Sequence, residues 1–292
     1  MQRSLTINIS LLYFLIMIQF AQVKQHTKMI ASKKLSILIV NFASASHLEN
    51  CIASIYRKFG DFLSWEVIII NNDKEDISKL SIDFSNVKIL NNNGNVGFGS
   101  GINMGAKEAC GEFLLTLNPD TEIISENIKS VLDEFSKDEK IGVISGKTMS
   151  KKGAIEPWSV GKELTFLDLI LNNIGFSRSR NIWNSCKKIE CDWATGTALF
   201  IKKNLFDKLG GFDENFFMYF EDMDLCKRVR NSGKKIIFFP EFEIYHSGGK
   251  SYNNKILQKR HYYDSMEYYL KKHGQLMTQK LVRLIRKLFI KK

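Results

Sequence analysis

The sequence predicts an α/β protein with a mostly parallel sheet flanked by helices. Short apolar runs rich in branched residues alternate with segments of helical period, which is the pattern of parallel strands joined by crossover helices. The expected strands are 35–42, 65–72, 86–92, 112–120 and 141–149, and the expected helices between them include 46–58 and 99–109. Several strands end abruptly in polar residues, at the sheet edge where such folds bind ligands. These polar ends include Asn41, Asn71, Asn72, Asp73, Asn118 and Asp120.

The α/β pattern resumes after a weaker stretch at 150–190, which is interpreted as a variable excursion. A turn and strand are expected at 192–203, a short helix at 205–209, a helix at 221–231 and a strand at 234–240. We therefore expect three segments: an N-terminal apolar extension at 1–34, one α/β domain at 35–255, and a helical basic tail at 256–292.

Composition excludes a disordered chain and gives no sign of a nucleic-acid-binding face. Of the 292 residues, 44% are apolar, which is enough for a full core. The net charge is +11, but eight basic residues and no acid follow Leu270, which leaves +3 for the rest of the chain. The five cysteines form no Cys-x-x-Cys pair, which favours a reducing compartment and ordinary core thiols.

Both ends of the chain have apolar segments that bear on membrane association. Residues 9–23 are strongly apolar but fall short of the roughly 20 residues that a spanning helix needs. They are interpreted as a signal anchor, an interfacial helix, or an extension upstream of a start at Met29. The tail at 275–292 is amphipathic and basic, as in helices that lie on anionic membranes. The alternative is a helix that packs on the protein's own core with a solvated basic face.

The segment 211–226, GFDENFFMYFEDMDLC, places five carboxylates among five aromatic residues. Aromatic side chains favour burial and carboxylates do not, so a segment with both is expected to line a pocket. Burial and crowding in such a pocket can tune a carboxylate into a base. The alternative is a solvated helix start.

Two further stretches suggest a metal site and a phosphate site. Asp120 follows Asn118 and Pro119 at the end of a strand, where a carboxylate can bind a hard divalent cation or simply cap the next helix. His246 precedes two glycines that allow a ligand to approach the backbone closely. The glycine-rich stretch 94–101 opens a helix and can present free amides to phosphate or sugar groups.

Taken in order, these motifs resemble those of the family 2 glycosyltransferases, which are inverting enzymes of the GT-A fold. The resemblance runs from about residue 35 to 251 and is similar to the rhamnosyltransferase-like branch of bacterial polysaccharide synthesis. It is carried by GFDENFFMYFEDMDLCKRVRNSGKKI, by the His246-Ser247-Gly248-Gly249 turn, and by three shorter motifs. Those are the Asn95–Gly99 loop, the Asn118-Pro119-Asp120 turn and the Trp193-Ala194-Thr195-Gly196 turn.

The resemblance implies a role for each matching residue. Asp222 would be the catalytic base, with Glu221 beside it, and Asp120 and His246 would hold Mg²⁺ or Mn²⁺. Trp193, Gly196 and Thr197 would lie near the donor sugar and the acceptor. The nucleotide side would comprise Asn41, Asn71, Asp73, Asn95, Gly97 and Asn118. The sequence departs from the family at Asn71, where an aspartate is usual, and at Ala43, so the preferred base of the nucleotide is open.

The implied function is transfer of a sugar to a lipid-linked glycan in cell-surface polysaccharide synthesis. The metal would neutralise the departing diphosphate while Asp222 takes the acceptor proton. The donor implied is dTDP-L-rhamnose; a UDP-linked hexose or galactofuranose is the first alternative. The second alternative is a non-catalytic, membrane-bound homologue that binds sugar nucleotides or glycans. The expected location is the cytoplasmic face of the bacterial inner membrane, with an anionic membrane surface as a partner of the tail and no nucleic acid.

Overall fold

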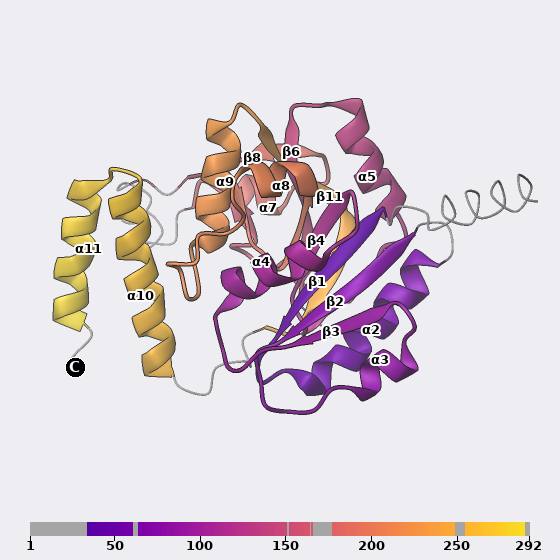
Figure 1. The fold of residues 1–292 in the computed structure, drawn as a ribbon. Helices are drawn as coiled ribbons and strands as arrows, with labels where there is room; N and C mark the ends of the chain where they lie inside the picture. The colour runs from indigo at the N-terminus through magenta and orange to yellow at the C-terminus, as the bar shows by residue number, and fades with distance from the viewer. Residues whose placement is uncertain are drawn as a thin grey trace, which may run out of the picture.

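A computed structural model of the chain describes residues 34–60, 64–150, 152–163, 165, 177–248 and 255–289. Within these residues a nine-stranded mixed sheet is covered by helices on both faces (Figure 1). The predicted α/β class with a largely parallel sheet is therefore confirmed. Nearly all of the expected N-terminal extension at 1–34, Gly249 and the last three residues of the tail lie outside the described residues.

The first half of the sheet is parallel, as the apolar runs predicted. It consists of β1 (Leu35–Asn41), β2 (Trp65–Asn71), β3 (Val87–Asn91) and β4 (Phe113–Leu117), in the spatial order β3-β2-β1-β4. The second half continues as β10 (Ala198–Lys202), β6 (Ile141–Met149), β11 (Lys235–His246) and β5 (Thr121–Ile123), and β8 (Ile189–Cys191) also pairs with β11. A small second sheet pairs β7 (Val160–Gly161) with β9 (Trp193–Ala194).

Strand β10 runs antiparallel between β4 and β6, which the alternating pattern did not indicate. Because β10 opposes β4, the start of β10 lies beside the end of β4, with Ala198 opposite Leu117. The turn before β10 is thereby brought to the carboxyl edge of the parallel strands. In the same way, antiparallel pairing of β11 with β5 places His246 opposite Thr121.

Helices cover the two faces of the sheet. They are α2 (Ala45–Phe59), α3 (Lys79–Asp83), α4 (Phe98–Glu108), α5 (Ile128–Lys137), α7 (Arg180–Trp183), α8 (Lys203–Lys208), α9 (Glu221–Asn231), α10 (Lys255–Lys272) and α11 (Leu276–Phe289). The buried residues of α2 and α5 belong to the apolar core on one face of the sheet, and those of α4 and α9 belong to the core on the other face. In Figure 1, α10 and α11 lie side by side at one end of the molecule, next to α9.

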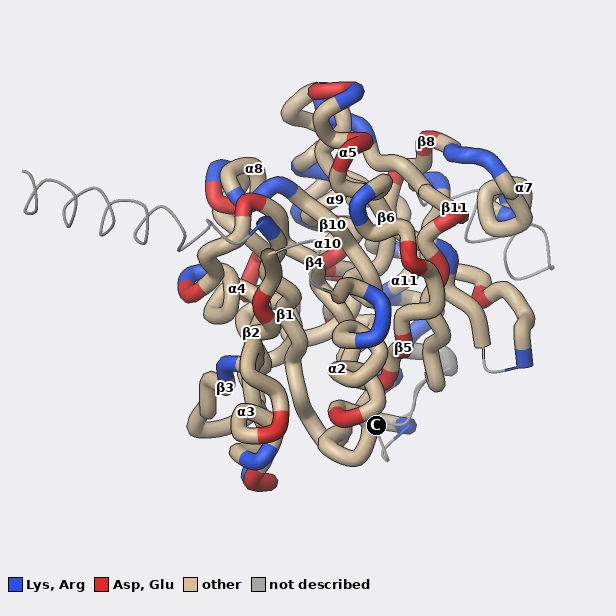
Figure 2. Tube along the Cα trace, turned by 90° about the vertical axis from the view of Figure 1, so that its right-hand side faces the viewer, with Lys and Arg blue, Asp and Glu red and all other residues tan. Residues whose placement is uncertain are grey.

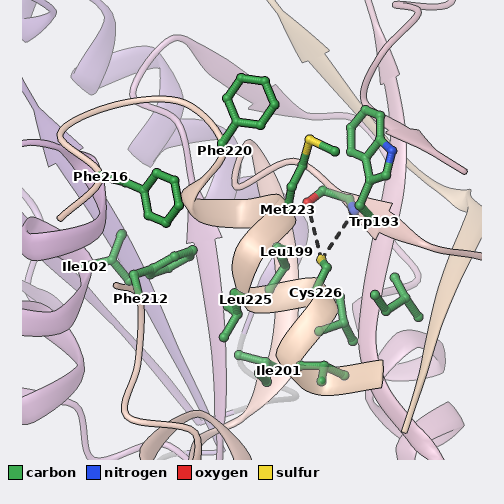
Figure 3. Packing of buried hydrophobic residues seen from close by; sticks show 14 of the residues in the cluster. Ile102, Trp193, Leu199, Ile201, Phe212, Phe216, Phe220, Met223, Leu225 and Cys226 are labelled. Carbon is green, nitrogen blue, oxygen red and sulfur yellow. Dashed lines mark hydrogen bonds between the residues drawn. The ribbon is translucent and has the colours of Figure 1, made fainter. Parts of the chain in front are cut away.

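The side chains of each central strand alternate between two apolar cores, as a period of two requires. Ile37 and Ile39 pack with α2, while Leu38 and Val40 pack with α4 on the opposite face. Figure 3 shows the second core around α9, where the Cys226 thiol hydrogen-bonds with the backbone of Ala194. Burial raises the pKa of Cys226 far above its usual range, so this thiol is a core group.

A row of asparagines ties the carboxyl ends of the parallel strands together. Asn41, Asn71 and Asn91 end β1, β2 and β3 in register. The Asn41 amide donates to Asn71 over 2.9 Å, and the Asn71 amide donates to Asn91 over 3.2 Å. One residue further on, the Asn72 amide donates to the Gly97 carbonyl over 3.2 Å. The row therefore also fixes the start of α4, since buried amides need partners.

The segment 211–220 is clamped to the start of α4. The Asn103 side chain accepts from the Phe212 N–H over 2.8 Å and donates to the Phe212 carbonyl over 2.9 Å. The Phe98 N–H donates to the Phe217 carbonyl. Gly97 has φ +88°, and a Cβ there would lie 2.3 Å from the Phe217 oxygen. Only glycine therefore permits this close approach.

Charged residues of both signs are interspersed along the described trace (Figure 2). The mixture agrees with the small net charge of +3 that the sequence has outside the residues after Leu270. None of the helices in the described ranges combines the length and the apolar content needed to cross a membrane.

Replacing Asn103 with Ala should destabilise the fold, because the buried backbone N–H and C=O of Phe212 would lose their partners. We expect a loss of about 2 kcal/mol in the free energy of unfolding, measured by chemical denaturation. Asn93→Ala is the matched control, since Asn93 is exposed and should change stability by less than about 0.5 kcal/mol. Equal effects for the two variants would show that the clamp contributes nothing to stability.

Candidate active site

A cavity of about 850 Å³ opens at the carboxyl edge of β1 and β4. It is lined by segments that are far apart in the sequence: the ends of the parallel strands, the turn before β10, the start of α9, the end of β11, and helices α10 and α11. Ten of the predicted site residues border it, namely Asn95, Gly97, Asn118, Asp120, Trp193, Gly196, Thr197, Glu221, Asp222 and His246.

Three predicted residues on the nucleotide side do not border this cavity. Asn41 and Asn71 are buried beneath it, where their amides serve the asparagine row. The Asp73 carboxylate accepts from the Ala43 N–H over 2.7 Å and so holds the turn after β1. Val40, Phe42 and Ser44 face the cavity from this side. Nucleotide binding by Asn41, Asn71 and Asp73 remains a prediction.

A strained turn precedes α9 and places Glu221 and Asp222, at the start of this helix, at the cavity. Tyr219 and Phe220 have φ of +68° and +66°, the left-handed region that bulky residues rarely adopt. Such residues cost about 1–3 kcal/mol each and persist where the surrounding structure holds them. Glu221, Asp222 and Asp224 occupy the first turn, where the helix dipole favours negative charge.

Asp222 is held by two backbone amides. Its Oδ2 accepts from the Gly196 N–H over 3.1 Å, and its Oδ1 accepts from the Met223 N–H over 2.8 Å. Burial raises the pKa of Asp222 above its ordinary value, although the two amides oppose this effect. A carboxylate with a raised pKa that keeps two donors is suited to accept a proton.

Glu221 is the more deeply buried of the adjacent carboxyls. Burial and the charge of Asp222 raise the pKa of Glu221 well above its usual range. Its Oε2 has no hydrogen-bond partner among the described residues. The amides of Gly196 and Met223 favour the charged form of Asp222, whereas only the backbone amide of Glu221 itself favours a charged Glu221. Of the two carboxyls, Asp222 has the more hydrogen-bond donors for its charged form.

The turn that contains Gly196, whose N–H donates to Asp222, is held in place by its neighbours. The Thr116 hydroxyl donates to the Gly196 carbonyl over 2.6 Å. A Cβ at Gly196 would lie 2.6 Å from the Phe98 ring, so glycine lets the turn pass this ring. The next residue, Thr197, accepts from the Asn118 amide over 3.4 Å. The turn thus joins Asp222 to the strand end that bears Asp120.

Asp120, His246 and Glu156 form a hydrogen-bonded chain. His246 Nε2 lies 3.3 Å from Asp120 Oδ1, and His246 Nδ1 lies 2.7 Å from Glu156 Oε2. Burial by itself would lower the pKa of His246, but the two carboxylates outweigh it and raise the pKa to about 9. Glu156 was not predicted, because it lies in the excursion at 150–190, whose weak periodicity gave no signal.

The Asp120–His246 pair fits a divalent cation. Two neighbouring ligands of an octahedral cation, each at about 2.1 Å, lie about 3 Å apart, close to the observed separation. Glu156 orients the imidazole so that Nε2 faces Asp120, the arrangement common around metal-bound histidines. A cation would replace the proton on His246. Among the described residues, no group of three or more His, Cys, Asp or Glu side chains is arranged to bind a metal ion. Any further ligands would therefore be phosphate oxygens or water.

Comparison with known sequences identifies the family. The family described as glycosyl transferase family 2 matches residues 36–209, which is more than half of the chain. The chain belongs to glycosyl transferase family 2. The protein is therefore a glycosyltransferase, and the alternative of a non-catalytic homologue is set aside.

Two curated relatives and one solved structure show what this glycosyltransferase is similar to. It is 24% identical to the N-acetylglucosaminyl-diphospho-decaprenol L-rhamnosyltransferase of Mycobacterium tuberculosis, over 73% of this chain and 75% of that protein. It is 26% identical to the low-salt glycan biosynthesis hexosyltransferase Agl10 of Haloferax volcanii, over 69% and 63%. The structure of GalNAc-T7 with UDP, GalNAc and Mn²⁺ superposes with a TM-score of 0.58 at 18% identity, over 73% of this chain and 43% of that one. That likeness shows the fold, as predicted.

Proposed function

We propose that this glycosyltransferase moves a sugar, with inversion, from a nucleotide-sugar donor to a lipid-linked glycan, and that Asp222 is the base. The observation that carries the proposal is the environment of Asp222. Asp222 borders the cavity at the start of α9 and accepts hydrogen bonds from two backbone N–H groups. Burial raises its pKa, and also that of the adjacent Glu221. The side chains proposed to face the donor phosphates, Asp120 and His246, border the same cavity.

The proposed reaction is a single displacement. An acceptor hydroxyl oxygen attacks the anomeric carbon on the face opposite the diphosphate, and its proton passes to Asp222. The new carbon–oxygen bond forms as the bond to the diphosphate oxygen breaks, so the configuration inverts. No covalent glycosyl–enzyme intermediate is needed, unlike in retaining glycosidases. Gly196 keeps Asp222 oriented through its N–H.

Asp120 and His246 would hold Mg²⁺ or Mn²⁺ in this proposal. The bound cation would supply positive charge to the departing diphosphate. Support comes from the 3.3 Å separation of the two ligand atoms, from the orienting hydrogen bond of Glu156, and from the Mn²⁺ in the GalNAc-T7 structure.

The preferred donor in this proposal is dTDP-L-rhamnose. The rhamnosyltransferase of Mycobacterium tuberculosis supports this choice and also the choice of a lipid-diphosphate acceptor. A UDP-linked hexose or galactofuranose is the second candidate, which the hexosyltransferase of Haloferax volcanii favours. A few pocket residues can decide between such sugars, because even a single hydroxyl or methyl group changes the contacts that a sugar makes in a pocket.

Asp222→Asn should slow transfer strongly while leaving donor binding intact, since the amide keeps the shape of the side chain but cannot accept the proton. We expect kcat to fall by about 10²-fold or more. The base must be ionised, so wild-type kcat should decline as the pH falls through the raised pKa of Asp222, at a higher pH than the ordinary value of about 3.9 would give. Asp133→Asn on the exposed surface of α5 is the control and should keep full activity. Transfer by Asp222→Asn at the wild-type rate would exclude Asp222 as the base.

Thermal denaturation should identify the donor, because a ligand that binds only the native state raises the melting temperature. We expect dTDP-rhamnose with Mg²⁺ or Mn²⁺ to stabilise the protein more than UDP-glucose, UDP-galactose or GDP-mannose does. Asp120→Asn should reduce the stabilisation that depends on the metal. A larger shift with a UDP-sugar would replace rhamnose by the second candidate, and a shift independent of metal would remove the cation from the proposal.

We further propose that α11 rests on the anionic cytoplasmic face of the bacterial inner membrane. Met277 is 79% exposed and Leu284 is 55% exposed, and they are seven residues apart on one side of the helix. The exposed Lys280 lies between them, so apolar and basic groups share this surface. Such a surface suits the boundary between anionic headgroups and acyl chains.

Met277→Glu combined with Leu284→Glu should weaken binding to vesicles that contain phosphatidylglycerol by about tenfold or more, since two apolar contacts are lost and two negative charges gained. Co-sedimentation measures this binding. Ile82→Glu on α3 is the matched control, because Ile82 is 80% exposed but lies on another helix. Membrane binding that survives the double substitution would exclude α11 as the contact.

A further inference from the structure

Two exposed aromatic side chains border the cavity. Trp158 is 44% exposed and Tyr262 is 39% exposed, and both line the same cavity as Asp222. None of the other large apolar side chains exposed in the described part of the chain carries a ring. Both exposed rings thus border the cavity that also contains the proposed base, and aromatic linings are typical of ligand-binding pockets.

Tyr262 lies on α10 and packs against the turn that precedes α9. Its ring centroid lies 5.3 Å from that of Phe220 and 5.7 Å from that of Tyr219. Gln258, one turn earlier on α10, donates to the Tyr219 hydroxyl over 2.8 Å and also borders the cavity. Tyr262 therefore faces the cavity next to the residues that lead into Glu221 and Asp222.

Trp158 reaches the cavity from the loop between β6 and β7. It has φ +71°, a conformation that a bulky side chain adopts only when neighbours hold it. Trp183 provides such a neighbour, since the two ring centroids lie 5.0 Å apart in an edge-on arrangement. Glu156, two residues earlier, orients His246. The same loop thus serves the proposed metal site and presents a ring to the cavity.

Helix α10 is anchored to α9 by a buried carboxylate. Asp224 is fully buried and pairs with Arg228 over 2.8 Å, with Lys272 over 2.7 Å and with His273 over 2.9 Å. The Ser265 hydroxyl adds a bond to the Met218 carbonyl. A buried carboxylate needs such partners, so they fix α10 relative to the base. Tyr262 takes no part in these bonds; it is 39% exposed and borders the cavity.

We infer that Trp158 and Tyr262 form the acceptor subsite. The apolar face of a pyranose ring of the glycan packs on these aromatic faces, while its reacting hydroxyl meets Asp222. The inference rests on the proposed function, because that function makes Asp222 the base. The same sugar chemistry is found in a soluble glycoside and in a lipid-linked glycan, and the experiment below separates these sources.

The test compares Tyr262→Leu and Trp158→Leu, which remove a ring, with Tyr262→Phe and Trp158→Phe, which keep one. The probes are the methyl glycosides of N-acetylglucosamine, glucose, galactose and mannose, and a synthetic N-acetylglucosaminyl diphospholipid. Binding is measured by saturation-transfer NMR with nucleoside diphosphate and Mg²⁺ present. Transfer kinetics and donor hydrolysis are measured in parallel, and melting temperatures verify folding.

Each leucine variant should weaken binding of at least one probe, and raise its KM as acceptor, by about tenfold. The phenylalanine variants should stay within about twofold of wild type, since the ring is retained. The loss in acceptor binding should exceed any change in donor KM or donor hydrolysis. Binding of the methyl glycosides would show that the sugar ring suffices, whereas binding of the diphospholipid alone would show that the lipid diphosphate is also needed.

Unchanged acceptor binding and KM in both leucine variants would overturn the inference, as would a wild-type protein that binds none of the probes. If wild type transfers no sugar but binds a glycoside through these rings, the subsite stands and the proposed function fails. If wild type transfers sugar and the leucine variants match it, the proposed function stands and the subsite fails.

Discussion

The clamp between α4 and the segment 211–220 is the contact on which the rest of the site depends. Three hydrogen bonds hold that segment against α4. The Asn103 side chain both accepts from and donates to the Phe212 backbone, and the Phe98 N–H donates to the Phe217 carbonyl. From there the strained turn at Tyr219 and Phe220 can start α9 at the cavity. Gly97 is essential to this arrangement, because a side chain there would occupy the position of the Phe217 carbonyl.

Charge at the site is controlled by burial and by backbone dipoles. Burial raises the pKa values of the adjacent carboxyls Glu221 and Asp222, and the amides of Gly196 and Met223 oppose this effect at Asp222. The third acid of the same helix turn, Asp224, points away to its basic partners on α9 and α10. One helix start thus supplies the proposed base and the carboxylate that anchors α10, the helix that bears Tyr262 of the proposed acceptor subsite.

Local pattern predicted most of the fold. The apolar runs at 35–42, 65–72 and 86–92 became β1, β2 and β3 within a residue or two, because buried parallel strands are continuously apolar. The antiparallel direction of β10 escaped prediction, since its sequence is apolar whichever way it runs. Pairing between residues about 80 positions apart, such as Ala198 with Leu117, is a long-range choice that periodicity does not encode.

The sequence by itself determined the α/β class, the polar strand ends and the acidic, aromatic segment from which Asp222 emerges, because these depend on residue type and short spacing. Only the tertiary structure decided which of those residues share a cavity. It placed Asn41 and Asn71 in a buried row that does not border the cavity, brought Trp158 and Tyr262 to the cavity lining, and set Glu156 against His246. The physical reason is that strand direction and helix docking are set by contacts between distant segments. Those contacts carry no signature in the local pattern of any one segment.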